Sequence, residues 1–237
     1  MLAQAGGSSR GVAFAATHAE LVFIIATSIA DAARSTKALR EAATKAGRIG
    51  PSIKVLPEIS WVVAETEQKA KAKYEQYLET ADVDGVLALL GGHTDTDFAG
   101  FDPKATLKGQ SSKGITTVAK VFEGIEGAGE WSFAELCDYL KLGYTSPTFV
   151  GTPDQIADTM EAWMDGADLD GFILAPVRAP GDLEEFVDMV VPELQKRGRL
   201  RTAYEGTTLR ENVNGHARLA PDHPGSRYKA GSGTFGV

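Results

Sequence analysis

Short apolar segments alternate with helical patterns along most of this chain, and this alternation restricts the fold more than any other feature. Residues 20–26 (ELVFIIA) form a continuous apolar run, typical of a strand buried on both faces in a parallel sheet. Residues 53–64 predict another strand, bent at Pro57 because proline donates no ladder hydrogen bond. Ser28 begins a helical pattern that ends at Gly47, and Thr66 begins another over residues 67–80. Strands separated by such helices predict right-handed βαβ units.

The opening segment predicts the end of a strand, a tight turn and the start of a helix. Apolar residues lead into Gly6-Gly7-Ser8-Ser9, and residues 11–19 carry apolar side chains at helical spacing. Such a turn gathers backbone N–H groups, hydroxyl groups and the positive end of a helix dipole, a combination that suits a phosphate. On the residues alone, a plain turn in which Ser8 or Ser9 caps the helix is the simpler interpretation.

Residues 81–144 are less regular, and we expect them to form an insertion over the working face of the fold. The insertion begins with a glycine-flanked loop around His93. We expect helices at residues 115–125 and after Ser132, where Glu135 completes a capping box.

The last third of the chain returns to regular patterns. Thr152 and Gln155 form a second capping box before a helix that ends at Gly166. We expect a short strand at residues 170–176 and a last helix at 182–198, kinked at Pro192 and closed by the basic run 196–201. Residues 202–237 predict a surface tail, poorly ordered beyond Gly215, and residues 1–237 a single domain.

Together these patterns predict four β–α units, with strands near Leu2, Leu21, Ile53 and Gly171. Four parallel units form either a small open sheet or half of an eight-stranded barrel, and the pattern alone does not choose between them.

Composition excludes several classes of function. The 237 residues carry a net charge of −8 with dispersed basic residues, which argues against nucleic acid as the main partner. No apolar run approaches the roughly 20 residues of a spanning helix, and no signal-peptide pattern is present, so we expect a cytoplasmic protein without membrane association. The single cysteine, Cys137, excludes an internal disulfide. Its acidic neighbours predict a thiol whose pKa is not lowered.

Several segments resemble, in order, those of the bacterial-luciferase-like flavin monooxygenases. The similarity is to the branch of nitrilotriacetate, dibenzothiophene-sulfone and long-chain alkane monooxygenases. Residues 4–23 resemble the pattern Q-A-G-x-S-x-x-G…F-A-A-x-x-A-E-x-V-F, and residues 55–59 resemble a V-L-P-G-I strand. Residues 92–94 match a G-H-T segment, and residues 150–157 resemble a V-G-T-P-E-Q-V-A helix start. Residues 170–172 and the tail segment 204–212 complete the series.

The resemblance implies an α/β fold, a TIM-type (β/α)8 barrel of which this chain is the C-terminal half, roughly strands five to eight. It implies an FMN-dependent two-component monooxygenase, in which a separate flavin reductase supplies FMNH2 and O2 is the co-substrate. A flavin C4a-(hydro)peroxide would oxygenate a small organic sulfur, amine or hydrocarbon substrate. One alternative is a deazaflavin-dependent oxidoreductase of the same superfamily. Another is a non-catalytic half-barrel that self-associates.

An opened barrel exposes two sheet edges and an apolar inner face, which proteins normally cover. We therefore expect this chain to form a homodimer or to bind a complementing N-terminal half.

By position, the resemblance assigns the FMN phosphate to Gly6, Gly7, Ser8 and Ser9. It also assigns His93 to the substrate end of the flavin, where an imidazole can donate to a peroxide or accept a proton. On the residues alone, a loop histidine or a helix cap remains an alternative. His93 with Asp95 and Asp97 mimics a metal cluster, but nothing else completes a coordination shell, so no metal site is predicted.

Overall fold

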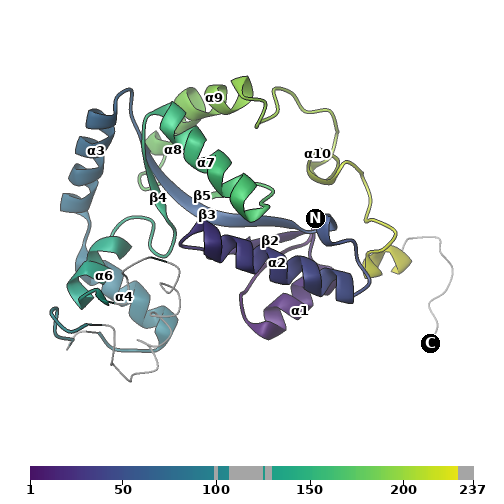
Figure 1. Cartoon of the computed structure of the whole chain (residues 1–237), viewed down its shortest axis with the longest axis horizontal. Helices are drawn as coiled ribbons and strands as arrows, with labels where there is room; N and C mark the ends of the chain where they lie inside the picture. The colour runs from purple at the N-terminus through teal and green to yellow at the C-terminus, as the bar shows by residue number, and fades with distance from the viewer. Residues whose placement is uncertain (99–100, 107–124, 126–129, 229–237) are drawn as a thin grey trace.

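The structure is a computed structural model of the chain and describes residues 1–98, 101–106, 125 and 130–228 (Figure 1). The helix expected at residues 115–125 lies almost wholly outside these residues. The described part contains one parallel sheet of five strands: β1 (Ala3–Ala5), β2 (Leu21–Ile24), β3 (Lys54–Val63), β4 (Thr148–Gly151) and β5 (Ile173–Leu174).

Most helices begin at the caps that the sequence predicts. Ser28, Thr66, Ser132 and Thr152 each accept a hydrogen bond from the first turn, and the boxes at Ser132 and Thr152 are complete. The helices are α1 (Ser9–His18), α2 (Ile29–Lys45), α3 (Glu67–Thr80), α4 (Val83–Thr94), α6 (Phe133–Leu140), α7 (Pro153–Ala167), α8 (Gly181–Glu185), α9 (Val191–Lys196) and α10 (Leu209–Asn214). No helix of the described residues is both long and apolar enough to cross a bilayer.

The longest strand, β3, pairs with three others. Its first four residues pair with β2, residues 60–63 pair with β4, and residues 58–59 pair with β5. The amides of Lys54 and Ser60 donate toward β2 and β4, whereas the carbonyls of Val55 and Ile59 accept from the β5 segment. Therefore β2 and β4 follow one another along one edge of β3, and β5 occupies the other edge. The strand continues through Pro57.

Two strand predictions need correction. The sequence predicted four strands, but β4 is a fifth; it is only four residues long and lies directly between Pro147 and the cap of α7, so its pattern is hidden. The strand expected at residues 170–176 is reduced to Ile173–Leu174, although Asp170 and Ala175 still donate to β3.

The core lies on one face of the sheet. Val55, Ile59, Trp61 and Val63 of β3 are all buried against the helices of this face. Their contacts come from α1, α2, α7 and the segment of α8 and α9. Successive strand residues point to opposite faces, so Leu56, Glu58 and Ser60 lie on the other face, which we call the inner face. Phe23, which pairs with Leu56, and Ile173, which pairs with Glu58, lie on it too and are half-buried.

The last helix is interrupted before Pro192, where a kink was expected. Residues Phe186–Val190 form a π-helical turn between α8 and α9. Pro192 has no amide hydrogen to donate, so the regular pattern of hydrogen bonds cannot pass through it.

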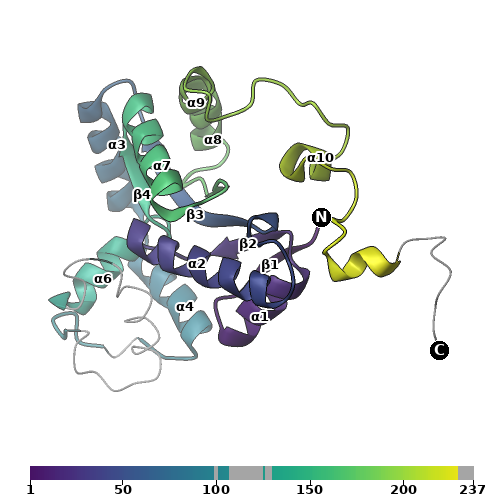
Figure 2. The same ribbon diagram turned by 45° about the vertical axis from the view of Figure 1, so that its right-hand side comes forward.

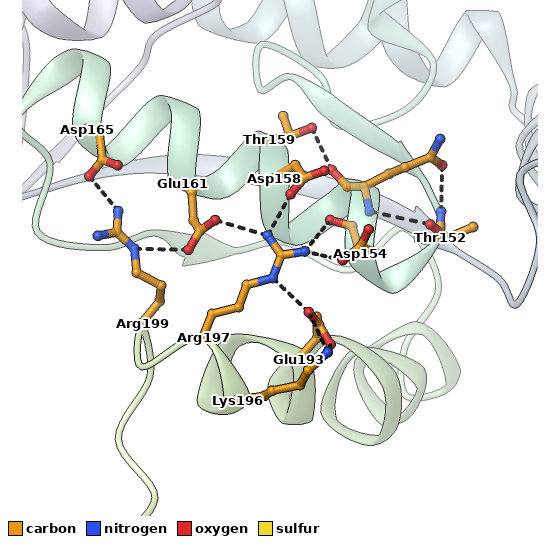
Figure 3. A network of polar contacts seen from close by, with 11 residues as sticks. Thr152, Asp154, Asp158, Thr159, Glu161, Asp165, Glu193, Lys196, Arg197 and Arg199 are labelled. Carbon is orange, nitrogen blue, oxygen red and sulfur yellow. Dashed lines mark hydrogen bonds and ion pairs between the residues drawn. The ribbon is translucent and has the colours of Figure 1, made fainter.

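Arg197 joins the end of this helix to α7 (Figure 3). Its guanidinium pairs with four carboxylates, those of Asp154, Asp158, Glu161 and Glu193. The Nη1–Asp158 and Nη1–Glu161 distances are 2.6 and 3.0 Å. The basic run therefore stabilises the packing of two helices rather than forming a nucleic-acid surface.

The insertion has a small core of its own, in which α4 and α6 pack together (Figure 1). Phe98, Phe101 and Phe133 form an aromatic cluster there, and Cys137 is buried beside it. Burial raises the pKa of the Cys137 thiol. The prediction that this pKa is not lowered is therefore confirmed.

The tail returns to the N-terminal end of the sheet, where α10 lies close to the N-terminus in both views (Figures 1 and 2). Arg210 of α10 donates to the buried Glu20 carboxylate at 2.7 and 3.1 Å, and the same carboxylate accepts the amide of Leu2 at 3.0 Å. His223 is buried, with Nε2 2.9 Å from the carbonyl of His18. These contacts attach the tail to α1 and to the start of β1.

The attachment of the tail is expected to depend on pH. Burial of Glu20 opposes its ionisation, but the hydrogen bonds from Arg210 and Leu2 outweigh it and hold the Glu20 pKa below its ordinary value. The pKa of a glutamate in an unfolded chain is about 4.3. A carboxyl group whose pKa is lower in the folded state stabilises that state at pH values above the unfolded pKa. This stabilisation is lost as the pH falls through the folded pKa. We expect the thermal midpoint of the wild type to fall more steeply between about pH 5 and pH 3 than that of Glu20→Gln. Calorimetry at a series of pH values measures this, and parallel curves would contradict it.

Candidate functional site

The turn between β1 and α1 places Gly6, Gly7 and Ser8 immediately before the first residue of a helix, Ser9. Ser8 is the N-cap of α1, and its Oγ accepts from the amide of Gly11 at 3.1 Å. A Cβ on Gly11 would lie 2.7 Å from the carbonyl oxygen of Gly6, so the helix starts against the turn only because residue 11 is a glycine. The predicted capping role of Ser8 is therefore present, and Ser9 is the first helical residue.

The groups of this turn fit a phosphate. The first amides of a helix have no acceptor within the helix, and the first turn of α1 contains no acidic residue, whereas α2, α3 and α7 each contain one. Gly6, Gly7, Ser8 and Ser9 are exposed, and a Cβ on Gly7 would meet nothing within 4 Å. The hydroxyl groups of Ser8 and Ser9 remain free to donate while the Ser8 Oγ accepts from Gly11.

His93 lies in the last turn of α4 and not in a glycine-flanked loop, which corrects the sequence expectation. Gly91 and Gly92 are helical, and the helix ends at Asp95, which adopts a left-handed conformation with φ 53°. Residues 83–90 are mostly apolar, and the helix that they form continues through Gly91 and Gly92 to Thr94. The low helix propensity of glycine would have predicted an earlier end. Its C-terminal turn is a place where an imidazolium complements the helix dipole.

The imidazole of His93 contacts Tyr144, in the turn that leads into β4. Its Nδ1 lies 3.0 Å from the phenol oxygen, and the rings meet edge-on with centroids 5.4 Å apart. Burial raises the pKa of the Tyr144 phenol, so the hydroxyl keeps its proton at neutral pH and can donate to Nδ1. Among the described residues, no three side chains of His, Cys, Asp or Glu come together in a group that could hold a metal ion.

The same turn reaches the inner face of the sheet. Gly143 has φ 76°, and a Cβ there would lie 2.8 Å from the carbonyl oxygen of Ser146 and 3.0 Å from Ser60 Oγ. The hydroxyl of the buried Ser146 donates to Glu58 Oε1 at 2.7 Å. Residues 143–146 thus connect His93 of the insertion to Glu58 of β3.

The two predicted parts of the site lie toward the same end of the sheet. The Gly6–Ser9 turn follows the C-terminal end of β1, and Ile24, the last residue of β2, pairs with Pro57 next to Glu58. The turn of residues 143–146 meets β3 just beyond this point. The Gly6–Ser9 turn and the turn of residues 143–146 therefore both lie toward the carboxyl end of the parallel sheet.

Sequence reasoning missed Glu58, Tyr144 and Ser146 as members of the site. Glu58 carried a usable signal, because it stands where the V-L-P-G-I pattern has glycine. Tyr144 and Ser146 carried none, since their positions follow from the fold of the insertion.

Comparison with known proteins identifies the family. Residues 2–170 match the family described as luciferase-like monooxygenase, and the chain belongs to this family. A relative, the dimethyl-sulfide monooxygenase of Hyphomicrobium sulfonivorans, is 37% identical over 228 residues, which are 95% of this chain and 48% of that protein.

Solved structures of similar proteins have the same fold as this chain. The crystal structure of DmoA from Hyphomicrobium sulfonivorans superposes with a TM-score of 0.87 at 36% identity, covering 95% of this chain and 48% of that one. A riboflavin lyase with modified FMN and riboflavin gives a TM-score of 0.81 at 32% identity, covering 97% and 51%. The chain therefore spans about half the length of these relatives. The predictions of a luciferase-like α/β fold and of a chain about half as long as its relatives are confirmed.

Proposed function

We propose that this chain forms the flavin-phosphate half of an FMN-dependent monooxygenase that acts on a small organic sulfur, amine or hydrocarbon substrate. The observation that carries the proposal is the Gly6–Ser9 turn, with its unpaired amides, two serine hydroxyls and no acidic residue in the following helical turn. Its relatives include a dimethyl-sulfide monooxygenase and a riboflavin lyase with modified FMN, which supports both the reaction class and the cofactor.

In this proposal each part of the site has a separate task. The Gly6–Ser9 turn holds the phosphate through backbone amides and the Ser8 and Ser9 hydroxyls. His93 is held by Tyr144 at the edge of the inner face, where its second nitrogen, Nε2, can give or take a proton. Reduced FMN supplies the electrons for O2 activation when it is bound, and a separate flavin reductase provides it. The protein excludes water and orients the substrate.

The sheet also indicates the kind of partner that completes the site. Its inner face presents half-buried apolar side chains, and β5 is a two-residue edge strand. Beside that edge lies a cavity of about 600 Å³, lined by apolar residues of α7, of the β5 segment and of the helix from 181 to 196, and by mostly polar residues of the tail. Because relatives are twice as long, we propose that a complementing half-barrel covers these surfaces; a second copy of this chain is the other candidate.

Titration with FMN tests the proposal. We expect Ser8→Ala to weaken FMN binding, followed by the quenching of flavin fluorescence, by roughly five- to tenfold, because a charge-assisted hydrogen bond is lost. Riboflavin, which has no phosphate, should bind wild type and variant equally.

Loss of a helix cap must be separated from loss of a phosphate donor. Ser28→Ala removes the N-cap of α2, whose Oγ accepts from Asp31 in the same manner as Ser8 accepts from Gly11. It should lower stability by about 1 kcal/mol without changing FMN affinity. If the two variants changed FMN affinity equally, the phosphate assignment would be wrong.

A further inference from the structure

We propose that Glu58 is a specificity-determining residue, whose carboxylate binds the protonated nitrogen of a small amine substrate on the inner face of the sheet. The inference rests on the proposed function and narrows its substrate class from sulfur compounds, amines and hydrocarbons to amines.

The position of Glu58 follows from strand alternation. Its neighbours Ile59 and Val55 are buried in the core under the helices, so Glu58 projects from the opposite, inner face. On this face Glu58 is the register partner of Ile173 in β5. Leu56, two residues earlier in β3, lies on the same face. A carboxylate thus lies among half-buried apolar side chains, close to the end of β2.

The carboxyl group of Glu58 is held by one hydrogen bond and has no ion-pair partner among the described residues. The hydroxyl of Ser146, a buried residue of the turn 143–146, donates to Glu58 Oε1 at 2.7 Å. Among the described residues, no lysine, arginine or histidine forms an ion pair with Glu58. By contrast, Lys54, the other ionisable residue of this face of β3, pairs with Asp170 at 3.0 Å.

An ionised carboxylate accepts up to about four hydrogen bonds and is costly to bury without a positive partner. One serine hydroxyl satisfies a small part of that capacity. A compact ammonium group would supply both charge and N–H donors, while its alkyl groups would contact the apolar residues nearby. A neutral sulfide or an alkane supplies neither charge nor donor, so the same carboxylate discriminates against it.

Binding to the 237-residue chain without flavin tests this assignment. Dimethylammonium chloride and dimethyl sulfide, a cation and a neutral molecule of similar shape, are titrated separately and followed by saturation-transfer NMR. We expect Glu58→Gln to weaken dimethylammonium binding roughly tenfold or more, as for the loss of a charge-assisted hydrogen bond, and to leave the weak binding of dimethyl sulfide unchanged. Ser146→Ala should weaken dimethylammonium binding less, because the carboxylate remains but is no longer held.

Two controls test whether the effect on dimethylammonium binding is specific to Glu58. Glu65→Gln removes an exposed carboxylate just beyond β3, paired with Lys69, and should leave dimethylammonium binding unchanged. Circular dichroism checks that each variant is folded. Equal dimethylammonium affinity of wild type and Glu58→Gln, or no saturable binding to the wild type, would overturn the proposal. Because no flavin is present, this outcome is independent of the FMN titration with Ser8→Ala.

Discussion

Replacing Trp61 with alanine should lower the free energy of unfolding by about 3–5 kcal/mol, a large part of the 5–15 kcal/mol typical of a domain. Trp61 is fully buried in β3, its ring lies 4.8 Å from that of Phe186, and its Nε1 donates to the carbonyl of Asp182 at 3.1 Å. The alanine variant loses the packing and the hydrogen bond together. Urea unfolding followed by far-ultraviolet circular dichroism measures the change.

Trp61→Phe separates the two contributions. It keeps an aromatic ring against Phe186 but leaves the carbonyl of Asp182 without its donor, so we expect a smaller loss of about 1–3 kcal/mol. If the alanine and phenylalanine variants were equally destabilised, the hydrogen bond rather than the packing would dominate.

Replacing Asp182 with alanine should lower the free energy of unfolding by a similar amount, about 3–5 kcal/mol, for an electrostatic reason. Its carboxylate is buried and accepts from the amide of Arg178 at 2.8 Å and from the hydroxyl of Tyr77 at 2.6 Å, and Lys73 lies 3.4 Å away. Removing the carboxylate leaves the Tyr77 phenol and the Arg178 amide without this acceptor, whereas Lys73 keeps its ion pair with Glu185. Burial and the Asp182 hydrogen bond raise the pKa of the Tyr77 phenol.

A spectroscopic readout distinguishes this explanation from a simple loss of packing. Alkaline titration of the tyrosines by ultraviolet absorbance should show one phenol ionising at lower pH in Asp182→Ala than in wild type. Glu184→Ala, which removes an exposed carboxylate two residues away, should alter neither stability nor the titration. An unchanged phenol titration in Asp182→Ala would contradict the role assigned to this contact.

Local chemistry made much of the fold predictable. Ser28, Thr66 and Thr152 define helix starts because each satisfies an amide within its own turn, and that interaction is encoded in adjacent residues. The apolar run at Leu21 predicts a parallel strand, and β2 does pair in parallel with β1 and β3. The expected burial on both faces is wrong, because Val22 alone of its four residues is buried and Ile25 is exposed. Features of this kind need no knowledge of distant segments.

The missed features depend on residues far apart in the chain. Strand β4 is stabilised by pairing with β3 about 90 residues earlier, and its four residues carry too little pattern alone. His93 was expected in a loop because glycines disfavour helices, but packing of α4 on α6 outweighs that preference. The link from Tyr144 and Ser146 to Glu58 requires the turn at Gly143, which no local pattern predicts.

The ion pair between Arg210 and Glu20 also affects the order of events during synthesis. These residues are 190 positions apart, and Glu20 is the group that fixes the start of β1 through the amide of Leu2. At about 5–20 residues per second, roughly 10–40 seconds pass between translation of the two. During that interval the start of the first strand lacks its final anchor, so this corner of the sheet is completed only after the tail has been made.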